Sequence, residues 1–280
     1  MARAIIDTHV HLATPEWLEG SLAPYRESVE QFFGISFSPV SVEEMARRYD
    51  MLDMTGLLLG WDAERNTGRP GIPNARIAGI VADHPETFVG FGSVDPLRPD
   101  ARERVAEVRD LGLLGVKLHP TMQGFDPSDE ALLPFFTAVA AAGLRILTHV
   151  GNSALGAGQP GGAGLRIDVA QPHRFDRIAA EFPDTPIMLA HLGAPWEQET
   201  LAMVLHKSNL YTDISGWKLK YLPEAVRRDM RGRLAGQVCF GSDYPMFDPG
   251  VQLEDFRGLG LPDDAAAAIL GGNARRFLGL

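Results

Sequence analysis

The chain is poor in cysteine. Its 280 residues include one cysteine, Cys239, so no internal disulfide can form and no cluster of thiolates can bind zinc. A metal site in this protein would therefore have to use histidines and carboxylates. We interpret Cys239 itself as a buried strand residue.

Long apolar runs are absent as well. No stretch approaches the roughly 20 apolar residues that a membrane-spanning helix needs. The N-terminus lacks the basic region, apolar stretch and small-residue cleavage site of a signal peptide. The sequence therefore predicts a cytoplasmic protein that does not bind membranes.

Basic residues are fewer than acidic residues. The chain has 26 Lys and Arg against 36 Asp and Glu, a formal net charge of −10. This balance argues against nucleic-acid binding through neutralised phosphates. The cluster of Arg227, Arg228 and Arg231 is interpreted as a solvated helix face. The expected partner is a small-molecule substrate.

Apolar sequence is plentiful and regularly arranged. Hydrophobic residues make up 45% of the chain, enough for a sizeable core in one domain spanning residues 1–280. Eight β-rich runs are predicted strands: Ala4–His9, Gly56–Leu59, Phe88–Gly92, Gly115–Leu118, Arg145–His149, Ile187–His191, Leu210–Ile214 and Val238–Ser242. Helical segments follow at Val42–Met54, Pro73–His84, Ala101–Leu111, Asp129–Ala142, His173–Phe182, Trp196–Leu205, Pro223–Leu234, Pro262–Leu270 and Asn273–Leu278. This alternation predicts an α/β fold, a (β/α)8 TIM barrel.

Two long loops are predicted at the active-site end of such a barrel. Ala13–Ser41 follows the first strand and is too aromatic for a disordered linker. We interpret it as a lid. Asn152–Asp168 is rich in glycine but lacks the pattern of a phosphate-binding or dinucleotide-binding loop. We interpret it as a mobile flap.

The first strand contains a His-x-His pair. His9 and His11 share one face of a strand because side chains alternate with period two. They could converge on one metal ion, or they could be an ordinary exposed pair. Polar residues at other strand ends favour the metal site: His149 and His191 end the fifth and sixth strands, and Asp243 follows the eighth. Such strand ends form the active-site face of a barrel.

The chain resembles the amidohydrolase superfamily, in the branch that includes aminocarboxymuconate semialdehyde decarboxylase. The matching segments run from the first strand to the last helix: Asp7–His11, Gly115–Pro120, Thr148–Gly151, Ala190–Gly193, Asp213–Gly216, Gly241–Pro245 and Gly271–Arg276. As a set they are specific for fold and site, and poorly specific for substrate.

The resemblance implies one divalent metal, most typically Zn²⁺, with Mn²⁺ or another divalent ion as alternatives. Its ligands would be His9, His11, His149 and Asp243. His191 would stand beside the metal-bound water as general base or oxyanion donor, and Asp243 would also shuttle a proton. The resemblance also makes a homodimer reasonable.

Lys117 allows two interpretations. In two-metal members of the superfamily, a carboxylated lysine on the fourth strand bridges the ions. In the branch that this chain resembles it does not, so we favour a free ammonium that faces the barrel interior or the substrate. His119 lies two residues on and is predicted to contact substrate, with a packing role as the alternative.

Weaker candidates surround this group. Trp196 and Trp217 could wall the substrate pocket or belong to the core. Arg65, and Arg69 near it, could bind a substrate carboxylate or be ordinary exposed loop residues. Asp7 and Asp213 are predicted to orient ligands. His84, His173 and His206 are expected at the surface.

The preferred function is metal-dependent hydrolysis of a small cyclic or acidic substrate, such as an amide or lactone. The alternative is non-oxidative decarboxylation of a small carboxylated aromatic or muconate-like substrate, which would use the same ligands. Several pocket cations would favour the decarboxylase. A third possibility is a non-catalytic barrel with a structural metal, which would require a closed ligand set with no room for water.

Overall fold

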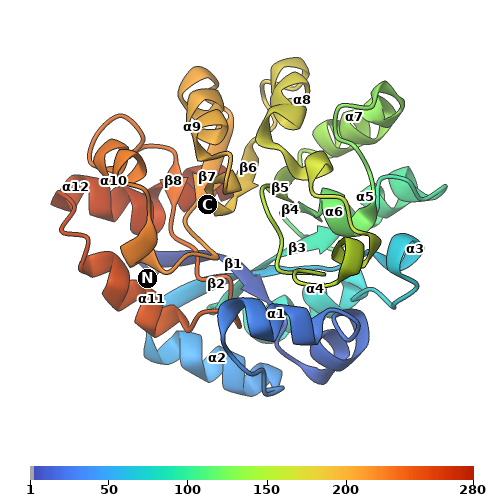
Figure 1. Cartoon of the computed structure of the whole chain (residues 1–280), viewed down its shortest axis with the longest axis horizontal. Helices are drawn as coiled ribbons and strands as arrows, with labels where there is room; N and C mark the ends of the chain where they lie inside the picture. Colours follow the sequence, from blue (N-terminus) through green and yellow to red (C-terminus); the bar gives the residue numbers. More distant parts are fainter. Residues whose placement is uncertain (1–2) are drawn as a thin grey trace.

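The computed structural model describes residues 3–280. Figure 1 looks into a ring of strands surrounded by helices, which confirms the predicted TIM barrel. The strands are β1 (Ile5–His11), β2 (Met54–Leu59), β3 (Phe88–Ser93), β4 (Gly115–Leu118), β5 (Arg145–His149), β6 (Ile187–Ala190), β7 (Leu210–Asp213) and β8 (Val238–Cys239). The α-helices are α1 (Arg26–Phe33), α2 (Val42–Met51), α3 (Glu64–Thr67), α4 (Asn74–Asp83), α5 (Ala101–Asp110), α6 (Pro120–Gln123), α7 (Leu133–Ala141), α8 (Asp176–Glu181), α9 (Glu197–His206), α10 (Glu224–Met230), α11 (Pro249–Arg257), α12 (Asp263–Ala267) and α13 (Asn273–Leu278).

The sheet is parallel and its strands follow chain order from β1 to β8. Backbone hydrogen bonds join β1 to the segment that follows β8. Thr8 N donates to Phe240 O at 3.0 Å, Asp243 N to His9 O at 3.0 Å, and His11 N to Tyr244 O at 2.8 Å. The barrel is thereby closed between β1 and the segment that follows β8.

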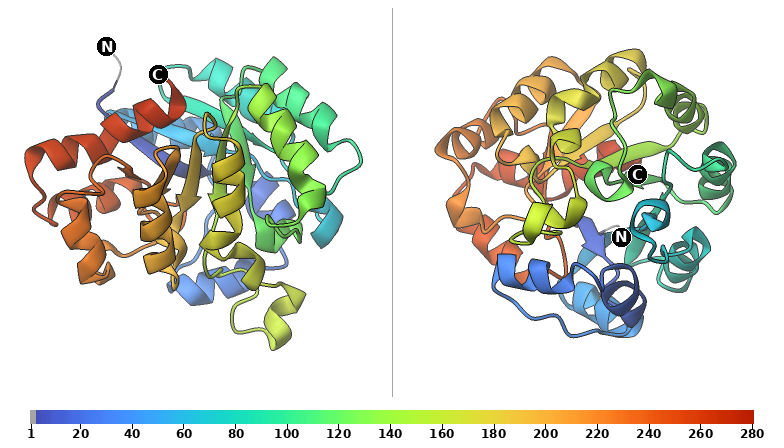
Figure 2. Two further views of the ribbon diagram at one scale, coloured as in Figure 1. Left: turned by 90° about the horizontal axis from the view of Figure 1, so that it is seen from above. Right: turned by 45° about the vertical axis from the view of Figure 1, so that its right-hand side comes forward.

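The barrel interior is packed at its N-terminal end. Ile6, Leu57, Phe91 and Met188 form an inner cluster with Phe277 of α13. Ring contacts of Phe277 with Phe91 and with Tyr211 hold α13 against this end. Both termini lie at this end of the molecule, and the yellow-green segment around residues 155–165 projects from the other (Figure 2, left).

Several element boundaries differ from those predicted. β1 continues to His11, whereas β6 ends at Ala190 and β8 at Cys239, so His191 and Asp243 lie just beyond their strands. α2 ends at Met51 rather than Met54, because Leu52 and Asp53 (φ +49°) turn the chain into β2. Helices α6 and α11 were not predicted, although each has Pro at N1, a common start signal.

The segment Ala13–Ser41 is ordered. It contains a π-helical turn at Glu16–Ser21 and the helix α1, and buries Trp17, Leu18 and Leu22. Among the described residues, no helix combines the length and the apolar character that crossing a membrane requires.

Candidate metal and catalytic site

The imidazoles of His9 and His11 point to the same side of β1 and meet Asp243. Asp243 Oδ1 lies 3.5 Å from His9 Nε2 and 3.3 Å from His11 Nε2. All three side chains are almost completely buried, and their ligand atoms lie within 4.8 Å of one another. This arrangement of two imidazoles and a carboxylate suits a divalent ion such as Zn²⁺.

An orphaned carboxylate oxygen supports the fit to a metal. Within residues 3–280, Asp243 Oδ1 and His11 Nδ1 are buried and have no hydrogen-bond partner. Leaving buried polar atoms unsatisfied is costly. A cation among the three side chains would satisfy the carboxylate oxygen.

Asp7 fixes the relative position of β1 and Asp243. Its carboxylate accepts hydrogen bonds from His9 N (3.1 Å), Ser242 N (2.9 Å), Ser242 Oγ (2.5 Å) and Tyr49 Oη (2.8 Å). Burial raises the pKa of Asp7 to about 6, against the lowering effect of these donors. The four bonds connect β1, α2 and the segment after β8.

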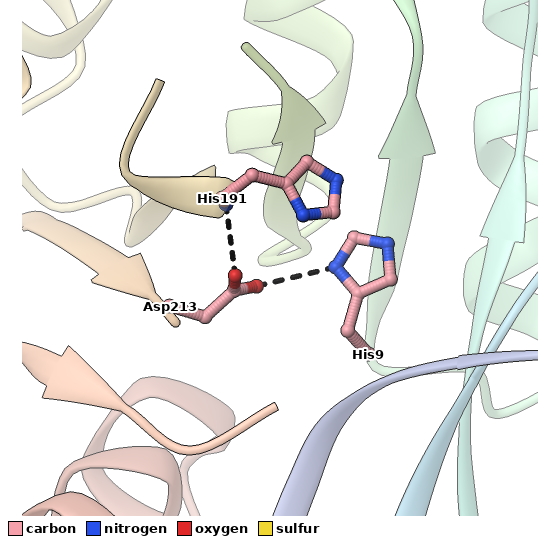
Figure 3. A group of neighbouring side chains, drawn as sticks. All are labelled: His9, His191 and Asp213. Atoms are coloured by element: carbon pink, nitrogen blue, oxygen red, sulfur yellow. Dashed lines mark hydrogen bonds and ion pairs between the residues drawn. The ribbon is translucent and has the colours of Figure 1, made fainter. Parts of the chain in front are cut away.

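Asp213 at the end of β7 connects His9 with His191 (Figure 3). Its Oδ2 lies 3.2 Å from His9 Nδ1, and its Oδ1 accepts the backbone N–H of His191 at 2.9 Å. Because the carboxylate only accepts, it holds the proton of a neutral His9 on Nδ1. His9 Nε2 then carries the lone pair that can bind a metal.

Ser215 defines the tautomer of His191. Ser215 Oγ donates to Asp213 Oδ1 at 2.5 Å and lies 2.8 Å from His191 Nδ1; the Ser215 carbonyl lies 3.1 Å from the same nitrogen. Since a hydroxyl has one proton, Ser215 must accept from His191. The neutral ring therefore has its proton on Nδ1 and a lone pair on Nε2.

Gly216 makes room for this group. A Cβ atom there would lie 2.9 Å from His191 Nδ1 and 3.3 Å from Asp243 Oδ2, and the backbone has φ +73°. Any other residue would strain the backbone and crowd both side chains.

Lys117 lies at the floor of the site with 2% of its surface exposed. Its Nζ is 3.1 Å from His9 Nε2. Burial lowers its pKa to about 8, although Asp243 and Asp213 oppose the shift. Burial also lowers the pKa values of His9, His11, His119 and His149, and the nearby ammonium adds to the effect. These imidazoles are thus neutral at pH 7, the form that binds metals.

Asp243 behaves differently from the imidazoles. Burial alone would raise its pKa, but the facing His191, His11 and Lys117 outweigh that effect and lower the pKa below its usual range. The carboxylate is therefore ionised at neutral pH.

His149 lines the same cavity but lies apart from the compact ligand group. Its Nε2 is 3.1 Å from the Asn152 carbonyl, to which it donates, and its ring stacks on His119 with centroids 4.0 Å apart. The His191 ring centroid is 5.0 Å away. Its role as a further ligand stays a prediction.

An aromatic cavity of about 460 Å³ opens above these groups. Trp17, from the predicted lid, stacks on His11 at 4.8 Å between centroids, and Trp61 packs edge-on against both His11 and Trp17. Phe32 and Phe33 of α1 also line the cavity, as do Asn152–Leu155 from the glycine-rich loop. Whether that loop is mobile stays a prediction.

The predicted substrate contacts separate into two groups. Lys117, His119 and Trp217 line the cavity, and Trp217 Nε1 donates to His191 O at 2.9 Å. Trp196 is not among the lining residues. Arg65 is not either: its guanidinium pairs with the buried Asp95 (2.8 Å) and with the Gln123 carbonyl, so the structure gives it a structural partner rather than a place at the site.

Sequence reasoning missed Ser215, Tyr49, Trp17 and Trp61 as individual site residues. Ser215 had a detectable signal, because it lies two residues after Asp213 at a strand end. The positions of Tyr49, Trp17 and Trp61 depend on how α2 and the loops after β1 and β2 pack, and no local pattern predicts that.

Comparisons with known proteins agree with the fold. A family model described as amidohydrolase matches residues 6–280. The 2-amino-3-carboxymuconate-6-semialdehyde decarboxylase of Dictyostelium discoideum is 24% identical over 281 aligned positions, covering 88% of this chain and 72% of that protein.

Solved structures show the same barrel. An uncharacterised TIM-barrel protein from Bordetella bronchiseptica is 25% identical (TM-score 0.82, 98% of each chain covered). A 2,6-dihydroxybenzoate decarboxylase bound to 2,6-dihydroxybenzoate is 17% identical (TM-score 0.72, 99% of each). A probable 2-pyrone-4,6-dicarboxylic acid hydrolase from Acinetobacter baumannii is 14% identical (TM-score 0.66, covering 99% of this chain and 100% of that one).

Proposed function

Because the chain belongs to the amidohydrolase family, we propose that it is a metal-dependent enzyme that decarboxylates a small aromatic or similarly planar acid without an oxidant. The observation that supports this most is the cavity, in which aromatic walls enclose a floor of histidines, Asp243 and the buried ammonium of Lys117. The relatives named as decarboxylases support the lyase over the hydrolase that the sequence favoured.

His9, His11 and Asp243 would hold the metal, with His149 as the further ligand. A bound Zn²⁺ or Mn²⁺ would supply a Lewis acid for substrate oxygens and would acidify a bound water. The cavity beside these ligands leaves room for a substrate, which argues against a closed structural site.

The protein's own groups explain how the carboxylate is lost. Lys117 attracts the substrate carboxylate to the floor, and the aromatic walls exclude water from it. The Nε2 lone pair of His191 accepts a proton from a substrate hydroxyl, which raises the electron density of the ring. Asp243 is ionised in the resting site, takes up a proton from solvent once the substrate is bound, and transfers that proton to the ring carbon. The C–C bond then breaks, its electron pair restores the aromatic ring, and carbon dioxide leaves. His191 returns its proton to the substrate oxygen, so one solvent proton is consumed in total for each carbon dioxide released.

Hydrolysis is the second candidate, because His191 and Asp243 could equally activate and deprotonate a water beside a carbonyl. The structural neighbour named as a probable 2-pyrone-4,6-dicarboxylic acid hydrolase supports this second candidate. It differs from decarboxylation in consuming water and releasing no carbon dioxide.

The test is a panel of hydroxybenzoates, lactones and amides offered to metal-analysed protein in ¹⁸O-labelled water. We expect carbon dioxide from a hydroxybenzoate. His191→Ala and Asp243→Asn should each lower kcat by about 10²–10⁴-fold. His206→Ala and Asp255→Asn, at exposed positions, serve as controls.

Two results would overturn the proposal. Incorporation of ¹⁸O into an opened lactone or amide, without carbon dioxide, would identify a hydrolase. Unchanged turnover in both His191→Ala and Asp243→Asn would refute the mechanism.

A further inference from the structure

We propose that the substrate is a monocarboxylate with an apolar substituent opposite its carboxylate, and that Glu197 excludes acids with a second carboxylate. This inference deepens the proposed function and rests on it. It would separate this protein from structural neighbours named for a dicarboxylic acid.

The first observation is the scarcity of cationic side chains. Among the described residues that line the cavity, Lys117 is the one lysine and there is no arginine. Its ammonium is buried at the floor beside His9, where it can attract a single carboxylate. The nearby Arg65 is occupied by Asp95, and Arg69 is exposed outside the lining.

The second observation is an acidic residue on the cavity wall. Glu197 lines the cavity at the start of α9. In the described part of the chain its side chain has no ion pair or hydrogen bond. A second substrate carboxylate near Glu197 would meet a like charge, and elsewhere it would be buried against apolar walls without a partner, which is unfavourable.

The third observation is the apolar wall. The predicted lid contributes Trp17, Leu22, Val29, Phe32 and Phe33, and Trp217 is among the other apolar residues that line the cavity. The volume of about 460 Å³ is in the range of sites for drug-sized ligands. A single bare ring would leave much of this wall uncovered, so an apolar substituent would add buried contact.

Equilibrium binding tests this without turnover. The probes are 4-alkylbenzoates from methyl to butyl and terephthalate, which replaces the methyl group of 4-methylbenzoate by a carboxylate. Calorimetry on the metal-loaded protein should show tighter binding with each methylene, by up to about fourfold. Terephthalate should bind at least tenfold more weakly than 4-methylbenzoate. Terephthalate binding as tightly as 4-methylbenzoate, or affinity that does not rise with chain length, would overturn the inference.

A charge reversal gives the sharper test. Glu197→Lys should improve terephthalate binding by about tenfold or more and change 4-methylbenzoate binding by less than threefold, whereas Glu197→Gln should give a smaller gain. Gln198→Lys, at an exposed neighbour outside the lining, controls for the added charge. Equal gains in Gln198→Lys and Glu197→Lys would refute the role of Glu197. If Glu197→Lys does not fold, the comparison of terephthalate with 4-methylbenzoate on the unaltered protein still tests whether a second carboxylate is excluded.

Failure of this inference is distinguishable from failure of the proposed function. A hydrolase with the same cavity would show the predicted binding pattern but release no carbon dioxide. A decarboxylase that accepts only dicarboxylates would support the proposed function and refute the inference.

Discussion

The Ser215 hydroxyl determines which ring nitrogen of a neutral His191 carries the proton. Ser215 donates to Asp213 and therefore accepts from His191 Nδ1. His191 also has a left-handed backbone (φ +62°), as does Asp243 (φ +65°), a conformation that costs energy for a non-glycine residue. Strain at the two residues predicted to be catalytic fits a site whose geometry is imposed by its surroundings.

Replacing Ser215 tests this orientation. Ser215→Ala should lower kcat by about 10–100-fold with a smaller change in KM, because a supporting hydrogen bond is lost while the cavity is retained. The ¹⁵N spectrum of His191 should change from a pure Nδ1–H form to a tautomer mixture. Ser215→Thr keeps the hydroxyl and should recover most of the activity. An unchanged tautomer in Ser215→Ala would show that the Ser215 carbonyl alone fixes the ring.

At the scale of elements, the site depends on how the ends of strands and helices are connected. α2 lies outside β1 and β2 (Figure 1), and its buried Tyr49 reaches Asp7 beside the metal ligands. The end of the same helix is fixed at Asp50, which accepts hydrogen bonds from Thr87 Oγ1 (2.6 Å) and Arg3 (2.7 Å). These contacts connect α2 to the segments that lead into β1 and β3.

The contacts of Asp50 can be measured through the pH dependence of the free energy of unfolding. The Thr87 hydroxyl, followed by Arg3, lowers the pKa of Asp50 in the folded state. The stabilisation that ionised Asp50 contributes is therefore fully present above its pKa in the unfolded state, near 3.9. It is lost as pH falls through the lower pKa of Asp50 in the folded state. Asp50→Asn should reduce the free energy of unfolding by about 0.2–1 kcal/mol at pH 7, because the carboxylate is half exposed.

Urea denaturation across pH provides the measurement. The difference between the native protein and Asp50→Asn should shrink as pH falls below about 4. Asp255→Asn, exposed on α11, should show no such trend. A difference that stays constant down to low pH would contradict the assigned role.

At the scale of the whole molecule, the candidate metal site joins the first strand to the end of the barrel. His9 and His11 come from β1, and Asp243 follows β8. An ion held by all three would bind the closed barrel and not the unfolded chain. Metal binding should therefore stabilise the entire fold.

Metal removal measures this coupling. At a free metal concentration 100 times its Kd, Zn²⁺ or Mn²⁺ should stabilise the protein by about 2.7 kcal/mol, a rise in Tm of several degrees that a chelator reverses. His11→Ala should lose most of the rise, and the exposed His206→Ala should retain it. An equal rise in His11→Ala would place the metal elsewhere.

The barrel was predictable because its signals are local. Apolar runs of strand length alternate with helical segments, and polar residues such as His149 stand where strands end. The convergence of His9, His11 and Asp243 follows from that topology, since parallel strands present their C-terminal ends at one face. Boundaries were less predictable, because the lengths of β1 and β8 depend on the hydrogen bonds that close the sheet.

The sequence by itself determined the barrel and the residues available as metal ligands. The periodicity of apolar residues, the ends of strands and the residue types at those ends all depend on residues that are neighbours in the sequence. Only the tertiary structure decided which neighbours share the site. It paired Arg65 with Asp95, left Trp196 off the cavity wall, stacked Trp17 on His11 and placed Glu197 on the wall. These outcomes depend on contacts between loops far apart in sequence, whose conformations are set by packing rather than by local pattern.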